Sequence, residues 1–266
     1  MQVAVTGSSG FVGGHVVRVL RERGYRVLTL DRMGTPDRRL NLCDVSAATL
    51  ADCDAVIHLA AHADISRNWE HGRLGELWSD NMTALFATLR ATPSTARFVF
   101  VSTAAVLDGA RSPYAASKLS GEAWVQAFAV RHGQTWPIVR LTSCVGRGYT
   151  HGHVADFARM WRTEGRIHAR NNGTRRNPFC HVEDAAECIV EQATGTPRAI
   201  IHVASEVWGW RDTLAVLRER VGHVEATWEE QDAGWIGDPL GLVVPAEWQC
   251  KRSVRDGVKE ALEEMT

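Results

Sequence analysis

The chain has 266 residues, with 30 lysines and arginines against 31 aspartates and glutamates. This length allows a large core, and the balanced charge excludes the strong field that attracts nucleic acid or an anionic membrane. We therefore expect a small-molecule partner, with no nucleic-acid and no membrane partner. No stretch approaches a membrane span and the first residues lack the basic region of a signal peptide, so we expect a cytoplasmic protein.

The potential metal ligands are scattered. None of the six cysteines forms a Cys-x-x-Cys pair, which disfavours a zinc site or a disulfide framework. His151 and His153 lack a third ligand at a recognisable spacing, and we interpret them as loop histidines. We expect no metal.

The first thirty residues have the pattern of a strand, a glycine turn, a helix and a second strand. An apolar strand is expected over Gln2–Thr6, and apolar residues recur at helical spacing over Phe11–Arg23. A second strand is expected over Tyr25–Leu30 and stops at Asp31. This order is typical of a dinucleotide-binding βαβ unit.

The glycine spacing has a chemical reason. Gly7 permits the tight turn, Gly10 lets the backbone approach a pyrophosphate, and Gly13 lets the helix pack against the strand. The amide groups at the helix N-terminus then face the phosphates. Asp31 can accept hydrogen bonds from the adenosine ribose and would repel a 2′-phosphate, so NAD is favoured, although Arg32 next to it leaves NADP open.

Short apolar segments separated by helical ones predict a doubly wound parallel α/β sheet. They are Ala55–Leu59, Phe98–Val101 and Pro137–Leu141, with a third strand expected near Arg39–Leu42. Ligands of such sheets bind at the carboxyl ends of the strands. Residues at those ends are Asp31, Asp44, Ala60, Ala61, Ser102, Thr103, Thr142 and Ser143.

Beyond Leu141 the pattern changes, which predicts a smaller C-terminal substrate lobe beside the Rossmann sheet. Strands at Ile167–Arg170 and Thr174–Phe179 flank Asn171-Asn172-Gly173, a predicted hairpin turn. Ala199–Val203 is a further expected strand. We expect residues 1–142 with 181–204 to form the NAD-binding domain, and residues 143–180 with 205–266 to form the substrate-binding lobe. Helices are expected over Ala155–Thr163, His181–Ala193, Thr213–Val221 and Ser253–Glu264.

Tyr114 and Lys118 are four residues apart after Pro113, in a segment expected to be helical, and therefore share a face. A cation beside a phenol favours phenolate and lowers a pKa that is about 10 when unperturbed, so such a tyrosine can transfer a proton near neutral pH. The spacing alone is common, and an incidental tyrosine at a helix start is the alternative.

In combination these motifs resemble the extended short-chain dehydrogenase/reductase family, the NAD-dependent epimerases and dehydratases of sugar metabolism. The chain is most similar to nucleotide-sugar 4-epimerases, through the glycine turn, His58-Leu59-Ala60-Ala61, the segment around Thr103, and Tyr114 to Lys118. The resemblance implies a homodimer. It also implies cofactor contacts from Gly7, Ser9, Gly10, Phe11, Val12, Gly13, Asp31, Arg32, Asp44, Val45, Leu59, Ala60, Ala61, Asn81, Val101, Tyr114 and Lys118.

The resemblance assigns three catalytic roles. Tyr114 would exchange a proton with a substrate hydroxyl, and Lys118 would hold the nicotinamide ribose and lower the pKa of Tyr114. Thr103 would hydrogen-bond the same substrate oxygen. Two alternatives stay open: Thr103 could instead cap its neighbours at the strand end, and Ser102 could take its role.

Departures from the family pattern concern the substrate. The dehydratases place an Asp-Glu pair after the catalytic Thr, where this chain has Ala104-Ala105, which argues against sugar dehydration. Nucleotide-sugar epimerases usually carry Asn at the position of Ser143 and a diphosphate-binding Arg at that of Asn177. Arg175 and Arg176 are close enough to replace that arginine, or are solvated strand arginines.

We therefore predict an NAD(P)-dependent oxidoreductase or epimerase acting on a sugar hydroxyl or ketone by hydride transfer. The favoured substrate is a nucleotide sugar, with an epimerase or ketoreductase reaction. The first alternative is a dehydrogenase of a free sugar acid or other small alcohol, since Leu141-Thr142-Ser143-Cys144 resembles the uronate dehydrogenases of the family. A non-catalytic dinucleotide sensor is less favoured, because a sensor needs none of Thr103, Tyr114 and Lys118.

Overall fold

The structure is a computed structural model that describes residues 1–63, 69–70, 72–169, 173–174, 176–229 and 244–266. Its chain divides into two compact units. The first comprises Met1–Leu141 and Ala185–His202, and the second comprises Thr142–Asp184 and Val203–Thr266.

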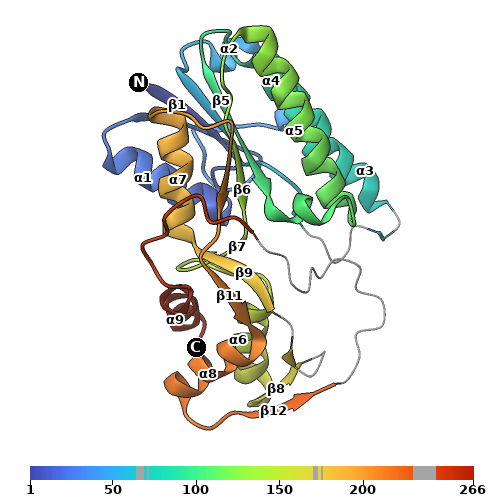
Figure 1. Cartoon of the computed structure of the whole chain (residues 1–266), viewed down its shortest axis with the longest axis vertical. Coiled ribbons are helices and arrows are strands. Elements are labelled where there is room, and N and C mark those ends of the chain that lie inside the picture. Colours follow the sequence, from blue (N-terminus) through green and yellow to red (C-terminus); the bar gives the residue numbers. More distant parts are fainter. Residues whose placement is uncertain (64–68, 71, 170–172, 175, 230–243) are drawn as a thin grey trace. The chain divides into compact units, whose positions relative to one another are not determined.

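The first unit is built on a seven-stranded sheet (Figure 1). The strands follow the order β10-β6-β5-β4-β1-β2-β3, and neighbouring strands from β6 to β3 run parallel. This is the doubly wound Rossmann arrangement, so the predicted fold class is confirmed. The strands are β1 (Gln2–Thr6), β2 (Arg26–Asp31), β3 (Arg38–Arg39), β4 (Ala55–His58), β5 (Arg97–Thr103), β6 (Ile138–Leu141) and β10 (Ile200–Val203).

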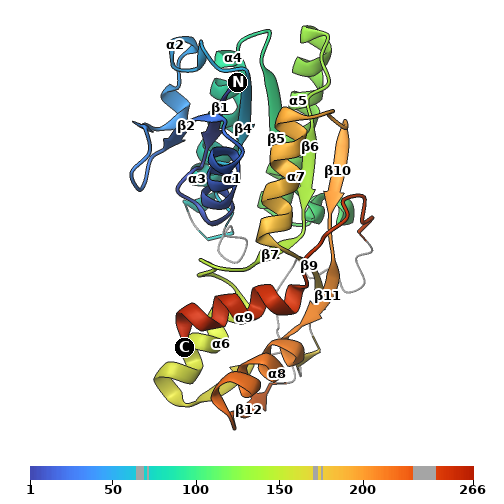
Figure 2. The same ribbon diagram turned by 90° about the vertical axis from the view of Figure 1, so that its left-hand side faces the viewer.

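Helices cover both faces of this sheet, as Figures 1 and 2 show. One face carries α1 (Phe11–Glu22) and the part of α7 (Val182–Thr194) that belongs to the first unit. The opposite face carries α4 (Ala84–Ala91) and α5 (Pro113–His132), whose apolar residues share a core with Phe98 and Phe100 of β5. Because both faces are covered, the middle residues of the inner strands are apolar, as at positions 3–5, 55–57 and 98–101. The shorter elements are α2 (Ala47–Leu50), α3 (Arg73–Trp78), the 3₁₀ helices η1 (Leu42–Asp44) and η3 (Ala104–Asp108), and the π-helical turn η2 (Ser79–Thr83).

The third strand differs from its prediction. The segment Arg39–Leu42 was expected to be a strand, but pairing with β2 is confined to Arg38 and Arg39. The chain then enters η1, because the side chain of Asn41 accepts a hydrogen bond from the amide of Cys43 and caps the helical turn. Local capping therefore ends the strand earlier than its apolar pattern suggests.

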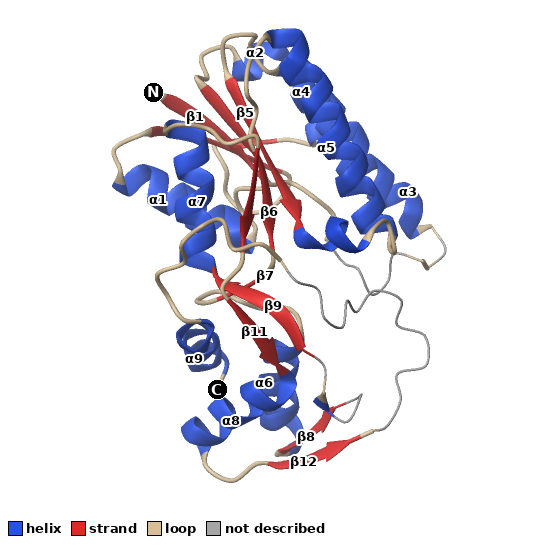
Figure 3. Ribbon diagram, in the orientation of Figure 1, coloured by secondary structure: helices blue, strands red, loops and turns tan. Residues whose placement is uncertain are grey.

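In its described residues, the second unit contains two small sheets and the helices α6, α8 and α9 (strands red in Figure 3). Its core packs Phe157, Phe179 and Trp208 with Val258 and Leu262. One sheet has the order β11-β9-β7, and the other pairs β12 with β8. The elements are β7 (Ser143–Val145), α6 (His153–Glu164), β8 (Arg166–Ala169), β9 (Arg176–His181), β11 (Glu206–Gly209), α8 (Trp210–Val221), β12 (Glu225–Trp228) and α9 (Val254–Met265).

The predicted hairpin between residues 167 and 179 is wrong. β8 pairs in parallel with β12, whereas β9 lies between β11 and β7. Burial explains the choice, since Ile167 and Ala169 of β8 lie in the core beside Val224 and Ala226. Within the part of the chain that the structure describes, no helix has both the length and the apolar character needed to cross a membrane.

Candidate active site

The glycine turn joins β1 to α1 in a conformation that excludes larger residues at two positions. Gly7 has φ +70°, and a Cβ there would lie 2.7 Å from the amide nitrogen of Ala60. A Cβ on Gly13 would lie 2.1 Å from the carbonyl oxygen of Gly7. The amide of Gly10 donates to that same carbonyl over 3.1 Å, which closes the turn ahead of Phe11.

The first turn of α1 contains no acidic side chain, and the positive end of its helix dipole favours an anion there. Phe11 and Val12 occupy that turn, and Ser9 precedes it. The shape and charge of the turn fit the pyrophosphate of a dinucleotide.

Asp31 is the last residue of β2, and the glycine turn fixes its carboxylate. The amide of Ser9 donates to Oδ2 over 2.9 Å, and the amide of Met33 donates to Oδ1 over 3.0 Å. The Ser9 hydroxyl also donates to the carbonyl of Met33 over 2.9 Å. A carboxylate has about four acceptor positions, so Asp31 keeps capacity for the hydroxyls of a ribose.

A pocket in the first unit adjoins Asp31. The sequence predicted only part of its lining. The residues that it missed either follow the end of β3 or lie on η2 and α4, and they are Leu40, Asn41, Leu42, Asp80 and Ala84. Asp44 is exposed and Val45 is buried, and neither is among the described residues that line the pocket. The lining residues are Gly7, Asp31, Arg32, Leu40, Asn41, Leu42, Ala60, Ala61, Asp80 and Ala84.

Hydrogen bonds to β1 and to η2 hold the segment that follows β4, residues 59–62. The amide of Leu59 donates to the carbonyl of Thr6, and the amide of Ala60 donates to the Thr6 hydroxyl, each over 3.3 Å. Asn81, buried in η2, accepts from the amide of His62 over 2.6 Å and donates to the Ser117 hydroxyl over 2.9 Å. Asn81 thus connects the segment that lines the pocket to α5, the predicted catalytic helix.

Thr103 ends β5, and its hydroxyl oxygen accepts a hydrogen bond from the amide of Ala105 over 3.2 Å. The capping role that the sequence left open is therefore present. It does not exclude catalysis, because a hydroxyl that accepts here keeps its proton to donate. Ser102 is buried and its hydroxyl donates to Glu122 over 2.6 Å, so this hydroxyl is committed to the interior.

Tyr114 and Lys118 both lie in the first two turns of α5. The helix begins at Pro113, and the Ser112 hydroxyl caps it by accepting from the amide of Ala115 over 3.1 Å. Tyr114 is half-buried, and its carbonyl accepts from the Ser117 hydroxyl over 2.8 Å. The start of this helix is therefore fixed by its own side chains.

The ammonium of Lys118 is buried beside the carboxyl end of β5. Its Nζ donates to the carbonyl of Val101 over 2.8 Å and lies 4.8 Å from the ring centre of Phe100. Burial lowers the pKa of Lys118 to about 8, against the opposing charge of Glu122. His58 is also buried, and its pKa is lowered to about 3 by burial and by Lys118, so it is neutral at physiological pH. His58 therefore adds no positive charge beside the ammonium of Lys118.

Glu122, one turn after Lys118, was not identified from the sequence. Its carboxylate forms a bidentate ion pair with Arg140 of β6, at 2.9 Å from Nε and 2.6 Å from Nη2, and also accepts from Ser102. Both side chains are largely buried, with 4% and 15% of the Glu122 and Arg140 side chains exposed. The pair fixes α5 against the strands that end at Thr103 and Leu141.

The predicted substrate residues lie in the second unit. Ser143 is exposed at the start of β7 and pairs with Phe179, two residues from Asn177 on β9, so the Ser143 and Asn177 side chains share one face of that sheet. Arg176 forms an ion pair with Asp212 at 3.1 Å and donates to the carbonyl of Val207 over 2.8 Å. Arg175 lies outside the described residues.

A model of the NAD dependent epimerase/dehydratase family matches residues 3–204, most of the chain and all the site residues of the first unit. The chain belongs to this family. The family predicted from the motifs is thereby confirmed.

Two curated members of the family show the extent of the similarity. A dTDP-glucose 4,6-dehydratase from Streptomyces griseus is 26% identical over 215 residues, which cover 68% of this chain and 66% of the relative. A UDP-glucose 4-epimerase from Azospirillum brasilense is 28% identical over 176 residues, which cover 54% of this chain and 49% of the relative. The chain thus spans about two thirds of the first relative's length and about half of the second's.

The solved structure of a UDP-glucose 4-epimerase from Thermotoga maritima, with UDP-glucose, has the same fold. Its TM-score is 0.86 at 21% identity, over 99% of this chain and 98% of that one. The residues of this chain also fit the cofactor, because Gly7 and Gly13 permit the tight turn and the close packing of α1 against it, and Asp31 offers fixed acceptors to a ribose.

Proposed function

We propose that this chain is an NAD-dependent epimerase or ketoreductase acting on the sugar of a nucleotide sugar. The first unit would hold the dinucleotide and the second would hold the substrate. The observation that carries the proposal is that a hydroxyl and a buried ammonium lie at the end of the same strand. Thr103 ends β5, and Lys118 donates a hydrogen bond to the carbonyl of Val101 on that strand. Burying an ammonium group costs free energy, and a lysine with a purely structural role has no need to be buried in this way.

The chemistry divides among three side chains. Bound NAD would supply the acceptor and donor of the hydride. Tyr114 would remove the proton of a substrate hydroxyl and return it to a ketone. Thr103, whose oxygen already accepts from Ala105, would donate its proton to the same substrate oxygen and stabilise developing charge. Lys118 would use its remaining N–H groups on the ribose beside Tyr114.

Sugar dehydration is not proposed, although one relative is a dehydratase. Elimination of water needs an acid and a base beside the catalytic threonine. Ala104 is buried and, like Ala105, carries no group that can move a proton. The name of the second relative, a 4-epimerase, agrees better with these residues.

One observation favours a second candidate, a dehydrogenase of a free sugar acid or other small alcohol. A nucleotide sugar requires a cation for its diphosphate, and Arg176 is engaged by Asp212 and by the carbonyl of Val207. Ser143 and Asn177, the other predicted contacts among the described residues, give the face that they share on β7 and β9 neutral hydrogen-bonding groups. Such a face suits a sugar without a diphosphate.

Exchange of Tyr114 for phenylalanine tests the catalytic assignment. Tyr114→Phe should retain NAD binding and lose most turnover, because only the phenolic oxygen is removed. Tyr25→Phe, a half-buried tyrosine just before β2, is the matched control and should remain active. An active Tyr114→Phe variant would contradict the proposed mechanism.

The two candidate reactions differ in the fate of the cofactor. An epimerase keeps NAD through turnover, so the protein denatured after purification should release NAD. A dehydrogenase exchanges NAD in each cycle and should produce NADH with a free sugar acid. Conversion of a UDP-sugar without net NADH would support the first candidate, and NADH formation with only a uronic acid would support the second.

We also propose a homodimer, which the family resemblance implies. The helix α5 exposes Leu119, Trp124 and Val130 over 40%, 44% and 82% of their surfaces, and Trp124 packs edge-on against Phe86 of α4. Exposed aromatic and aliphatic residues on neighbouring helices are typical of an interface. Light scattering after size exclusion should give twice the mass of the chain, and Trp124→Glu should halve it.

A further inference from the structure

An ion pair joins two sides of the pocket beside Asp31. Arg32 directly follows Asp31, and its guanidinium reaches Asp80 of η2, which is 48 residues later in the chain. The two contacts are parallel, with Nη1 at 2.8 Å from Oδ1 and Nη2 at 2.9 Å from Oδ2. Both residues line the pocket, so the ion pair forms part of its wall.

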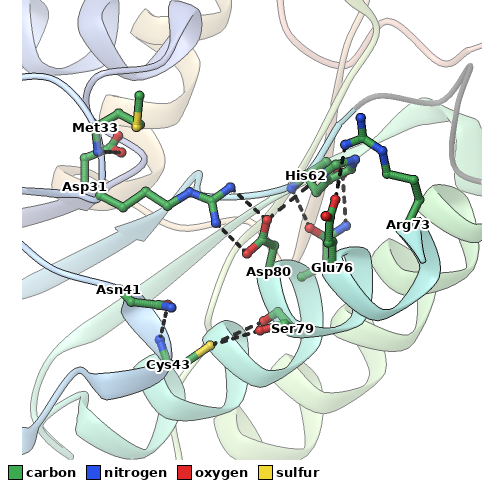
Figure 4. A network of polar contacts seen from close by, with 11 residues as sticks. Asp31, Met33, Asn41, Cys43, His62, Arg73, Glu76, Ser79 and Asp80 are labelled. Atoms are coloured by element: carbon green, nitrogen blue, oxygen red, sulfur yellow. Dashed lines mark hydrogen bonds and ion pairs between the residues drawn. The ribbon is translucent and has the colours of Figure 1, made fainter.

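Asp80 is the fixed member of the pair. Its side chain is 16% exposed, whereas that of Arg32 is 58% exposed. The ring nitrogen Nδ1 of His62 lies 3.8 Å from Oδ2 on the other side of the carboxylate, as Figure 4 shows. The next residue, Asn81, is anchored to the backbone of His62 through two hydrogen bonds. The long arginine side chain has therefore extended to a carboxylate that its surroundings hold in place.

The position of Arg32 bears on the choice of cofactor. An acidic residue at the end of the second strand favours an unphosphorylated ribose, whereas an arginine nearby accommodates a 2′-phosphate. Arg32 is the only positively charged residue among the described residues that line the pocket. In the structure its two terminal nitrogens are directed at Asp80, while the oxygens of Asp31 are directed at Ser9 and Met33.

We propose that Asp80 is a specificity residue that acts through Arg32. By holding the guanidinium in a bidentate ion pair, it withholds from a 2′-phosphate the one cation among the described residues that line this pocket, and leaves Asp31 to select the free ribose of NAD. The inference rests on the proposed function of the first unit in binding a dinucleotide. It predicts that the neutral variant Asp80→Asn tolerates a 2′-phosphate better than the wild type does.

Binding of two mononucleotides measures this preference without turnover. Isothermal titration of the full chain with 5′-AMP and with adenosine 2′,5′-bisphosphate gives the ratio of the two affinities. In Asp80→Asn the released guanidinium can bond to the 2′-phosphate, and a charge-assisted hydrogen bond corresponds to roughly a tenfold change in affinity. We expect the ratio to shift by that factor toward the bisphosphate.

Two further variants separate the proposed cause from a general charge effect. Glu76→Gln removes the same charge from a nearby carboxylate that pairs with Arg73 and makes no hydrogen bond to Arg32, so the ratio should stay at the wild-type value. The double variant Arg32→Gln/Asp80→Asn lacks the guanidinium and should also return the ratio to the wild-type value.

The outcomes are distinct. An unchanged ratio in Asp80→Asn overturns the inference, and so does a gain that persists in the double variant or appears equally in Glu76→Gln. A wild-type protein that binds neither mononucleotide would instead refute the proposed dinucleotide site. If the protein purifies with a nucleotide bound, the nucleotides released on denaturation give the same comparison, and we expect a larger NADP fraction from Asp80→Asn.

Discussion

The buried ion pair of Glu122 and Arg140 gives the sharpest test of what holds the catalytic helix. Three hydrogen bonds converge on the Glu122 carboxylate, two from Arg140 and one from Ser102. Glu122→Gln keeps the size of the side chain, but it places an NH₂ group against the N–H groups of the guanidinium. Arg140 would then lose the charge of the Glu122 carboxylate while its side chain stays largely buried.

Breaking such a pair from one side costs about 3 to 5 kcal/mol, because the remaining charge stays buried. For a domain of 150 to 250 residues, each kcal/mol lowers Tm by about 2 to 4 °C. We therefore expect Glu122→Gln to lower the melting temperature by roughly 10 °C. The matched control is Glu22→Gln, which breaks the exposed ion pair of Arg18 and Glu22 on α1. An exposed helical pair contributes only about 0.3 to 0.5 kcal/mol, so its Tm should fall by no more than about 2 °C.

Circular dichroism at 222 nm during heating, repeated in urea, measures both variants. Unfolding by heat and unfolding by urea should both show that Glu122→Gln loses several times more stability than Glu22→Gln. If Glu122→Gln melted within about 2 °C of the wild type, the reasoning about uncompensated buried charge would be refuted for this site.

Two further predictions concern the glycine turn and Lys118. Gly13→Ala should abolish binding of 5′-AMP, because the new Cβ would lie 2.1 Å from the carbonyl oxygen of Gly7. Gly14→Ala is the control, because a Cβ there meets nothing within 4 Å; it should keep binding and gain up to about 1 kcal/mol in helix stability. Calorimetry measures both the binding and the stability. Since burial lowers the pKa of Lys118 to about 8, the pH profile of turnover should fall above pH 8 as the ammonium deprotonates. The stability of the fold changes with pH in the opposite direction. The pKa of Lys118 is about 8 in the folded chain and 10.5 in the unfolded chain, so the unfolded chain binds the proton more tightly between these pH values. The charged lysine therefore destabilises the fold below pH 8, and this destabilisation is relieved as the pH rises. Lys118→Met should therefore lose activity without losing stability at pH 7, whereas the exposed control Lys259→Met should change neither, and a marked destabilisation of Lys118→Met at pH 7 would contradict the stated cost.

The sequence by itself determined the doubly wound sheet and the location of the dinucleotide motif. Strand and helix periodicity are local properties, and β1, the glycine turn and β2 follow one another without interruption. Parallel strands place their carboxyl ends at one edge, so the sequence also located Asp31 and Thr103 at strand ends. Where a local cap competed with an apolar pattern, as at Asn41, the strand prediction was too long.

Only the tertiary structure decided which side chains meet. The hairpin between β8 and β9 was wrong because core burial paired β8 with β12, a strand more than fifty residues away. Ser102 and Thr103 are neighbours in sequence, yet one faces Glu122 in the interior and the other caps η3. No spacing rule links Arg32 to Asp80, because contacts between residues this far apart depend on the packing of whole elements. The sequence therefore identified the residues of the proposed dinucleotide site, and the fold determined that Asp80 holds Arg32.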